Sequence, residues 1–205
     1  IIEFAAQSRR FVPHFHMPLQ SGNNKQLKQM RRRYLRELYA ERVDWINTVM
    51  PHACIGVDVI VGFPGETEAD FEETYRFLQA LDIAYLHVFT YSERPNTPAA
   101  EMEGKVPMQE RRRRNEMLRI LSQKKKRQFY QRFAGTVRPV LFEKSKQAGR
   151  MTGFTDNYIR VDLPLNENLL NEVAEVQLLQ VNPEGLMQAA CVSNAPVDHP
   201  SSAVQ

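Results

Sequence analysis

Apolar residues in the first two-thirds of the chain alternate between short continuous runs and stretches with helical spacing. The runs at 10–19, 53–62 and 83–91 predict three buried strands. After residue 23, apolar residues recur on one arc of a 3.6-residue wheel and predict a core-facing helix (Leu35, Tyr39, Val43, Ile46 and Met50). The spacing of Thr67 and Asp70 is typical of a capping box, which predicts a second helix to about residue 80. This alternation indicates βαβ units with a parallel sheet.

The last third of the chain has a different pattern. A long helix is predicted at 107–133, starting at Pro107, with an apolar arc that Lys125 shares. Five short β-rich segments follow, at 136–142, 150–154, 158–163, 172–181 and 186–192. They predict a small closed antiparallel barrel of the OB type. We therefore expect an α/β domain at 1–135, a β-barrel at 136–193 and a disordered tail at 194–205.

Composition excludes several classes of protein. Hydrophobic residues make up 42% of the 205, enough for a packed core. No apolar run reaches the ~18–20 residues that span a bilayer, and the first residues do not resemble a signal peptide, so no membrane partner is expected. The two cysteines, Cys54 and Cys191, are too few for a zinc or iron–sulfur centre or a disulfide framework. This usage favours a cytoplasmic location.

Positive charge is concentrated in the long helix. Residues 107–134 carry ten Lys or Arg against two acids, whereas the whole chain has a net charge of only +3. A polyanion such as RNA would meet one basic rod on an otherwise acidic body. The alternative is a solvated charged face. Candidate RNA contacts lie on the helix (Arg111, Arg112, Arg113, Arg114) and on the barrel (Arg138, Lys144, Phe154, Tyr158, Arg160).

Three loops follow the predicted strands, and in parallel α/β folds such loops build the active site. The first, at 18–24, offers an amide, a hydroxyl and a glycine suited to ribose hydroxyls or a carboxylate, or else a helix cap. In the second, at 56–66, Gly62 would let a flat ligand approach the backbone and Glu66 would accept from an amine. The alternative is a turn with an acidic helix start. The third, at 91–98, holds Arg94 between prolines, or is a plain surface loop.

Histidines raise the question of a metal. His14 and His16 point to one face of the first predicted strand, and His87 could join them. Because no third ligand lies at close spacing, hydrogen-bonded histidines are the favoured interpretation, and no metal site is predicted.

Four motifs closely resemble the radical-SAM methylthiotransferases. They are HFHMPLQSG at 14–22, MRRRY at 30–34, DVIVGFPGET at 58–67 and YSERPNTPAA at 91–100. The barrel resembles the RNA-binding TRAM domain of that family. GFTDNYIR at 153–160 and HVF at 87–89 are most similar to the branch acting on threonylcarbamoyl-adenosine beside the tRNA anticodon. Asn23 and Asn96 depart from the family, which usually has Ser and Gly there.

The resemblance implies a fold and a chemistry. The fold would be the C-terminal half of a radical-SAM partial (βα)6 barrel followed by TRAM. The full-length enzyme would use S-adenosylmethionine, two [4Fe–4S] clusters and an electron donor, and would act on the tRNA anticodon stem-loop. This chain lacks the Cys-x₃-Cys-x₂-Cys motif, so we expect no cluster in it and no activity of the chain alone. The implied cofactor-binding residues are Gln20, Ser21, Gly22, Asp58, Gly62, Phe63, Pro64, Gly65, Glu66, Tyr91, Ser92 and Arg94.

Other functions remain open. Within the family, the substrate could instead be isopentenyl-adenosine or an aspartate of a ribosomal protein. A non-catalytic RNA-binding module would explain the charge asymmetry but not the three loops. A metal-dependent hydrolase would need a His/Asp cluster, which we expect to be absent.

Overall fold

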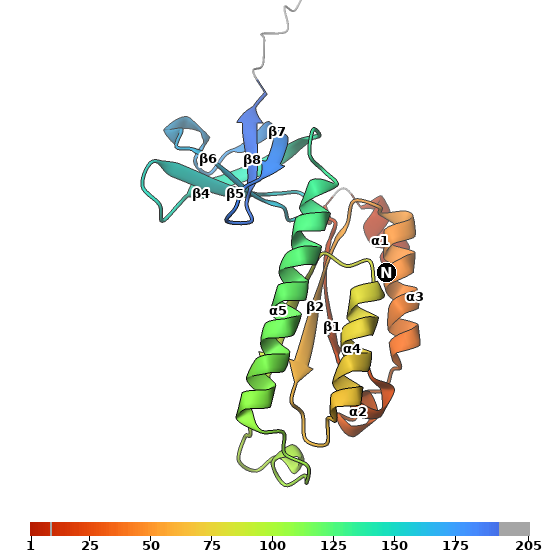
Figure 1. The fold of residues 1–205 in the computed structure, drawn as a ribbon. Coiled ribbons are helices and arrows are strands. Elements are labelled where there is room, and N and C mark those ends of the chain that lie inside the picture. The colour runs from red at the N-terminus through yellow and green to blue at the C-terminus, as the bar shows by residue number, and fades with distance from the viewer. Residues whose placement is uncertain (9, 193–205) are drawn as a thin grey trace, which may run out of the picture. The chain divides into compact units, whose positions relative to one another are not determined.

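The computed structural model describes residues 1–8 and 10–192, in two compact units (Figure 1). The first contains residues 1–132 and 156–158, and the second contains residues 133–155 and the chain from 159 on. The tail expected at 194–205 lies outside the described residues. Along the chain described, no helix is long and apolar enough to cross a membrane.

A parallel sheet forms the centre of the first unit, as predicted. Its strands are β1 (His14–Gln20), β2 (Cys54–Val61) and β3 (Tyr85–Thr90), hydrogen-bonded in the order β1-β2-β3. Both pairings are parallel, with Met17 opposite Val57 and Val57 opposite Leu86. The helices are α1 (Ile2–Gln7), α2 (Asn24–Gln29), α3 (Arg36–Val49), α4 (Glu68–Ala80) and α5 (Met108–Gln131), with a short 3-10 helix at Pro98–Ala100.

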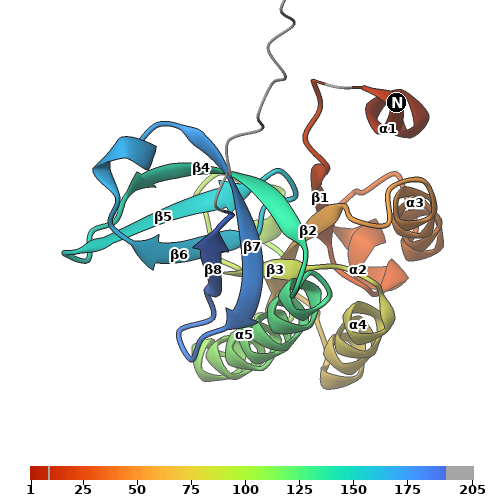
Figure 2. The same ribbon diagram turned by 90° about the horizontal axis from the view of Figure 1, so that it is seen from above.

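Alternate strand residues build the core of this unit. One face of the sheet, with Leu19, Val57 and Leu86, packs against the apolar sides of α3, α4 and α5, and the helices gather on that side in Figure 2. The capping box predicted at Thr67 is present: its hydroxyl accepts from the Asp70 N–H, and the Asp70 carboxylate accepts from the Thr67 N–H. The opposite face of the sheet carries polar and aromatic side chains instead.

Local predictions were wrong at three places. The first helix, α1, was not predicted, and the first strand begins at His14 rather than residue 10. The single helix expected after residue 23 is two helices, because Arg31 adopts a φ of 56° in the left-handed region and ends the helical run. Leu35 consequently caps α3 and is 57% exposed instead of joining the core stripe.

The basic helix α5 is less solvent-facing than its composition suggests. Arg111, Arg114 and Lys125 are all buried. The Lys125 ammonium donates to the carbonyls of Gln79 at 3.0 Å and Leu81 at 2.7 Å, at the carboxyl end of α4, where a cation is favoured. Burial lowers the pKa of Lys125. Arg111 and Arg114, both predicted as RNA contacts, therefore do not lie on the solvent-facing side of the helix.

Ion pairs explain how two arginines can be buried. The Arg114 Nη1 lies 2.8 Å from Oε2 of Glu66, and its Nη2 lies 3.1 Å from Glu68. Arg111 Nη2 lies 2.6 Å from Oε1 of Glu93. These acids come from the loops after β2 and β3 and from the start of α4. Counting charges within 107–134 alone therefore missed them.

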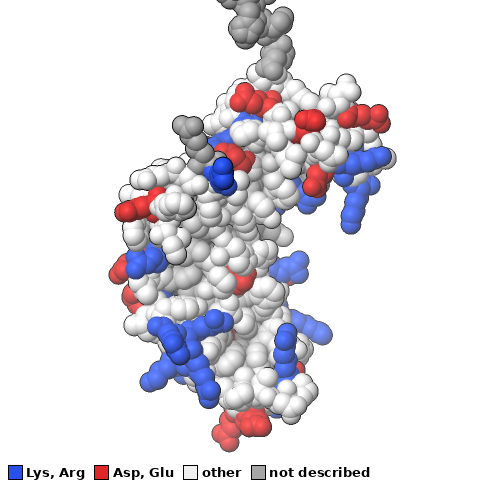
Figure 3. All heavy atoms as spheres, turned by 180° about the vertical axis from the view of Figure 1, so that it is seen from behind, with Lys and Arg blue, Asp and Glu red and all other residues white. Residues whose placement is uncertain are grey.

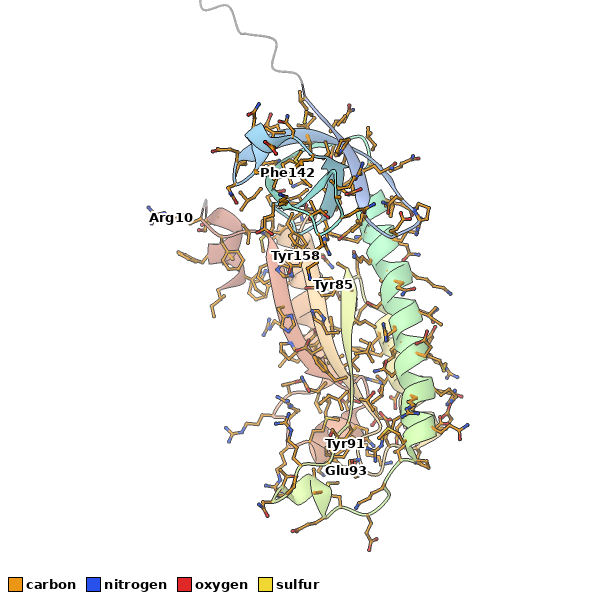
Figure 4. The ribbon with its side chains drawn as sticks, turned by 90° about the vertical axis from the view of Figure 1, so that its left-hand side faces the viewer. Arg10, Tyr85, Tyr91, Glu93, Phe142 and Tyr158 are labelled. Carbon is orange, nitrogen blue, oxygen red and sulfur yellow. The ribbon has the colours of Figure 1, made fainter. Side chains whose placement is uncertain are left out.

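The second unit is a closed five-stranded barrel, as predicted. Its strands are β4 (Val137–Lys144), β5 (Arg150–Thr155), β6 (Arg160–Pro164), β7 (Val173–Val181) and β8 (Met187–Cys191), with a 3-10 turn at Glu167–Leu169. They close in the order β4-β5-β6-β8-β7. The pairing of β6 with β8 is parallel, so the barrel is not wholly antiparallel as expected. Phe142 is fully buried in the barrel (Figure 4).

The pairing of Arg114 gives a prediction for stability. Replacing Arg114 with Gln leaves the buried Glu66 carboxylate without its cation, and breaking such a pair costs about 3–5 kcal/mol. We expect that loss in the free energy of unfolding of the first unit, followed by the fluorescence of Trp45, the single tryptophan. The matched control is Arg112→Gln on the exposed side of the same helix, which should change stability by no more than about 0.5 kcal/mol. Equal effects of the two substitutions would contradict the structural role of Arg114.

Candidate functional site

The three parallel strands end at one edge of the sheet, next to a cavity of about 570 Å³. Figure 4 shows Tyr91 and Glu93 at this edge and Tyr85 toward the other end of the strands. Each predicted loop contributes to the cavity: Gln20 from the first, Ile60 and Phe63 from the second, and Tyr91, Thr97 and Pro98 from the third. A smaller cavity of about 400 Å³ adjoins it and is lined by Ser92 and Arg94, among others. The loops thus converge, as the parallel topology predicted.

Several residues of the larger cavity were not among the predicted site residues. They are Gln29, Met30, Arg31, Arg32, Ile60, Thr97, Pro98, Ala99 and Met102. The sequence marks residues 30–34 only as part of a family motif and predicts no role for them. Its place after a short helix, rather than directly after a strand, concealed its position at the sheet edge.

In the first loop, some residues hold the local fold and one lines the cavity. Ser21 is fully buried; its hydroxyl lies 3.2 Å from the Thr74 hydroxyl and accepts from the Asn23 N–H. An added Cβ on Gly22 would lie 2.9 Å from the Phe77 ring, so this glycine permits close packing on α4. Asn23 caps α2 by accepting from the Gln26 N–H at 2.9 Å. Only Gln20, with a φ of 76°, faces the cavity.

The second loop is held by α5 rather than left open for a ligand. Gly62 has a φ of 76°, and an added Cβ would lie 2.3 Å from Cγ of Arg111. The flat group expected to approach Gly62 on this side is therefore a protein side chain. The Glu66 carboxylate accepts from the Gly62 N–H at 2.7 Å and from Arg114. Burial raises the pKa of Glu66, although these two donors act against the shift.

The rest of this loop also serves the turn. Pro64 is buried, and the Gly65 N–H donates to the Gly104 carbonyl at 2.8 Å. The Oε2 of Glu66, expected to accept from a ligand amine, is already held by the Gly62 N–H and by Arg114. From 56–66, Ile60 on the strand and Phe63 in the turn line the cavity.

The third loop, at 91–98, has one anchoring residue, Glu93, and five residues that line one or both cavities. Glu93 accepts two hydrogen bonds from Arg111, which lower the pKa of its carboxyl to about 2. Arg111 also donates to the Tyr91 carbonyl at 2.9 Å. Ser92 and Arg94 are exposed at the smaller cavity. The loop is thus fixed at its start, while its tip is accessible to a ligand.

The cavity combines apolar walls with unsatisfied polar atoms. The Phe63 and Tyr91 rings meet edge to face, with centroids 5.3 Å apart. The Tyr91 hydroxyl and the Oε1 of Gln29 are buried without a hydrogen-bond partner among the described residues. Buried polar atoms are usually paired, so these two suit the polar groups of a ligand. A ligand with a flat ring and several polar groups, such as the S-adenosylmethionine implied by the resemblance, fits this lining.

Asp58 lies away from both cavities, in the middle of β2. Its Oδ2 is 2.8 Å from Nε2 of His16, and His87 on β3 completes a group whose possible ligand atoms lie within 4.8 Å of one another. The Nε2 of His14 is 2.8 Å from the Tyr85 hydroxyl. Hydrogen-bonded histidines were the favoured interpretation, and these contacts agree with it. The expectation that a His/Asp cluster is absent is therefore wrong, because three neighbouring strands bring His16, Asp58 and His87 together. These three residue types could hold a transition metal.

Burial and neighbouring charge act on the same group of histidines. Burial, together with the nearby His16 and His87, lowers the pKa of His14. The neutral form of His14 is therefore favoured, which suits its hydrogen bond with the Tyr85 hydroxyl.

An iron–sulfur cluster does not fit the residues of this chain. Cys54 is buried in β2, where burial raises the pKa of its thiol to about 12. Cys191 is exposed at the end of β8, in the other unit. One thiol per unit cannot supply the three or four thiolates that a [4Fe–4S] cluster takes.

The barrel residues predicted to contact RNA include an aromatic ring paired with a cation. Phe154 on β5 is 40% exposed and lies opposite Arg160 on β6, whose guanidinium is 6.0 Å from the ring centroid. Arg138 lies 4.9 Å from the Phe133 ring, and Lys144 is exposed at the end of β4. Tyr158, grouped with the first unit, stacks on His14. Exposed aromatic and basic side chains of this kind are typical of surfaces on which bases stack.

Comparisons with known proteins place the chain in a family. Residues 1–78 match the Radical SAM superfamily. The chain is 36% identical over 184 residues to the threonylcarbamoyladenosine tRNA methylthiotransferase MtaB of Bacillus subtilis (strain 168), covering 88% of this chain and 41% of that protein. It is 40% identical over 162 residues to the protein of the same name from Aquifex aeolicus (strain VF5), covering 78% and 38%.

A relative with a second name is similar over the same region. The tRNA-2-methylthio-N(6)-dimethylallyladenosine synthase of Buchnera aphidicola subsp. Baizongia pistaciae (strain Bp) is 33% identical over 188 residues, which cover 91% of this chain and 42% of that protein. The chain therefore spans about two fifths of the length of these curated relatives. These matches, with the four motifs and the parallel sheet that carries them, identify the chain as a member of the radical-SAM methylthiotransferase family.

Proposed function

We propose that this chain belongs to a tRNA-modifying enzyme and supplies part of its S-adenosylmethionine site and of its RNA-binding surface. The enzyme would attach a methylthio group to threonylcarbamoyl-adenosine beside the anticodon, in the cytoplasm. The observation that carries the proposal is the cavity at the strand ends, where three motif loops meet and two buried polar atoms lack partners. The relatives from Bacillus subtilis and Aquifex aeolicus, whose names include threonylcarbamoyladenosine, support this choice of substrate.

The residues of the chain would bind and orient the cofactor. When bound, S-adenosylmethionine and the iron–sulfur clusters of the full-length enzyme, reduced by an electron donor, supply the radical chemistry and the methyl group. Gln20 would hold a polar part of the cofactor, and the Phe63 and Tyr91 rings would flank a flat one. Arg111 and Arg114 would act indirectly, because they fix the loops that carry Phe63 and Tyr91.

RNA would contact the second unit as well. We assign the barrel the role of a TRAM domain, with Phe154 stacking a base and Arg138, Lys144 and Arg160 near phosphates. On α5, Arg112 remains a candidate contact because it is exposed, whereas Arg111 and Arg114 are engaged with carboxylates. Arg113 is half-exposed but paired with Glu68 and Glu110, so an RNA phosphate would have to compete with two acids.

The reaction itself is tested by incubating the full-length, cluster-reconstituted enzyme with tRNA that carries threonylcarbamoyl-adenosine. Mass spectrometry of the nucleosides should find one methylthio group in place of one hydrogen on that nucleoside. Methylthiolation of tRNA that carries isopentenyl-adenosine, with none of the first tRNA, would assign the enzyme to the isopentenyl-adenosine branch. If neither tRNA is methylthiolated, the proposed function is refuted.

The cofactor site is tested by filling the cavity. Ala99 lines both cavities, whereas its neighbour Ala100 lines neither, and the two are similarly half-buried in the same 3-10 turn. We expect Ala99→Trp in the full-length enzyme to weaken S-adenosylmethionine binding at least about tenfold, because the ring occupies the space of the ligand. Equilibrium dialysis measures the affinity, and urea unfolding checks that both variants remain folded. If Ala100→Trp weakens binding as much as Ala99→Trp, the cavity is not the cofactor site.

The cysteine positions give a prediction for the 205-residue chain alone. Reconstituted with iron and sulfide, it should retain no stoichiometric [4Fe–4S] cluster and should not cleave S-adenosylmethionine, because each unit offers one thiol. Iron and sulfide analysis with near-ultraviolet absorbance measures the content. A stable cluster on the chain would contradict this expectation, and Cys54→Ser would then identify whether that thiol is a ligand.

A further inference from the structure

A run of three arginines borders the larger cavity in the first unit. Arg31, Arg32 and Arg33 form the loop between α2 and α3, and all three are exposed. Arg31 and Arg32 line the cavity together with Gln20 and Tyr91, whereas Arg33 lines neither of the two strand-end cavities. In Figure 3, blue side chains gather at the lower left, over the part of the molecule where α2 lies.

These arginines differ from those of α5 in their charge balance. Within residues 1–8 and 10–192, no carboxylate forms an ion pair with Arg31, Arg32 or Arg33. The nearest acid along the chain, Glu37, is engaged by Arg36 and by the amide of Asn24. In the first turns of α5, by contrast, three arginines form ion pairs with carboxylates of this unit. Unneutralised positive charge at the site therefore lies on the 31–33 loop.

The backbone of this loop is fixed. The N–H of Arg31 donates to the Lys28 carbonyl at 3.0 Å, and the N–H of Arg32 donates to the Leu27 carbonyl at 2.9 Å. The Tyr34 hydroxyl lies 2.9 Å from the Leu19 carbonyl, to which it donates, and this ties the loop to the end of β1. A fixed backbone presents the guanidinium groups near one place, so less entropy is lost when an anion binds.

A fourth arginine, Arg94, lies at the adjoining cavity. Arg94 lines the smaller cavity, which shares Ile60, Tyr91, Thr97 and Ala99 with the larger one. It is exposed and forms no ion pair with a carboxylate of the described chain. The two adjoining cavities thus both have exposed arginines, Arg31 and Arg32 at the larger and Arg94 at the smaller, and they share apolar and aromatic lining residues.

We propose that Arg31, Arg32 and Arg33 bind backbone phosphates of the RNA next to the nucleoside that enters the cavity. The inference rests on the proposed function and names the surface that positions its substrate. A guanidinium group matches a phosphate in charge and in fork geometry. Because Arg33 lies outside both strand-end cavities, a small anion held inside would leave it unused, whereas a polymer extending from the cavity engages all three. RNA phosphates meet this requirement and the cofactor carboxylate does not.

The test uses two double variants of the full-length enzyme that remove equal charge. Arg32→Gln/Arg33→Gln changes the loop, and Arg42→Gln/Arg76→Gln changes exposed arginines on α3 and α4. The probe is a synthetic anticodon stem-loop carrying threonylcarbamoyl-adenosine, titrated at several salt concentrations. The loop variant should bind roughly tenfold more weakly at 0.1 M salt, with a log–log salt slope about 1.4 units less steep, since each single-strand contact contributes about 0.7. The control should keep the affinity and slope of the wild type.

Two further measurements separate the outcomes. S-adenosylmethionine affinity of the loop variant should equal that of the wild type; a loss of cofactor affinity with an unchanged RNA slope would assign the arginines to the cofactor and overturn the inference. Equal losses in both double variants would also overturn it, because they would indicate diffuse surface charge. Methylthiolation of tRNA by the wild type is measured separately. If the wild type is active and the loop variant binds RNA normally, the inference fails while the proposed function stands.

Discussion

The burial of two arginines at the start of α5 is the constraint on which the strand-end site depends. A guanidinium group cannot be removed from water unless carboxylates and carbonyls replace its hydration. Arg114 meets this need with Glu66, and Arg111 with Glu93 and the Val106 and Tyr91 carbonyls. One helix turn therefore fixes the loops after β2 and β3. These ion pairs therefore also fix the positions of Phe63 and Tyr91, which line the cavity.

The same ion pairs show that the glycine motif after β2 accommodates a protein side chain. The positive φ of Gly62 and the lack of a Cβ let the Arg111 side chain lie against the strand end, and the Gly62 N–H holds Glu66 in place for Arg114. Glycine, glutamate and two arginines form one connected unit behind the cavity. A substitution at Gly62 would consequently disturb the fold before it reached any ligand, so the cavity is better tested from Ala99, on its open side.

The sequence predicted the fold well where a pattern was local. The strand at 54–61 is apolar except for Asp58, and Thr67 and Asp70 form the capping box. The five barrel strands are short β-rich runs separated by turns. It predicted which loops converge, because parallel strands end at one edge. Which residues of each loop face the cavity depended on distant partners: Ser21 turns to Thr74, and Glu66 to Arg114. No spacing along the chain contains that information.

The exposed positive charge of the long helix was predicted wrongly for the same reason: acidic partners are distant in the sequence. A count over 107–134 sees ten cations and two acids, although three of the neutralising acids, Glu66, Glu68 and Glu93, lie up to 48 residues away. Once those pairs are formed, the first turns of α5 lose much of their capacity to attract a polyanion. The short run at Arg31–Arg33 has a smaller formal charge but keeps it, because no carboxylate of the described chain pairs with it. For a polyanion, the field at the cavity mouth is therefore set by arginines without carboxylate partners rather than by the richest segment of the sequence.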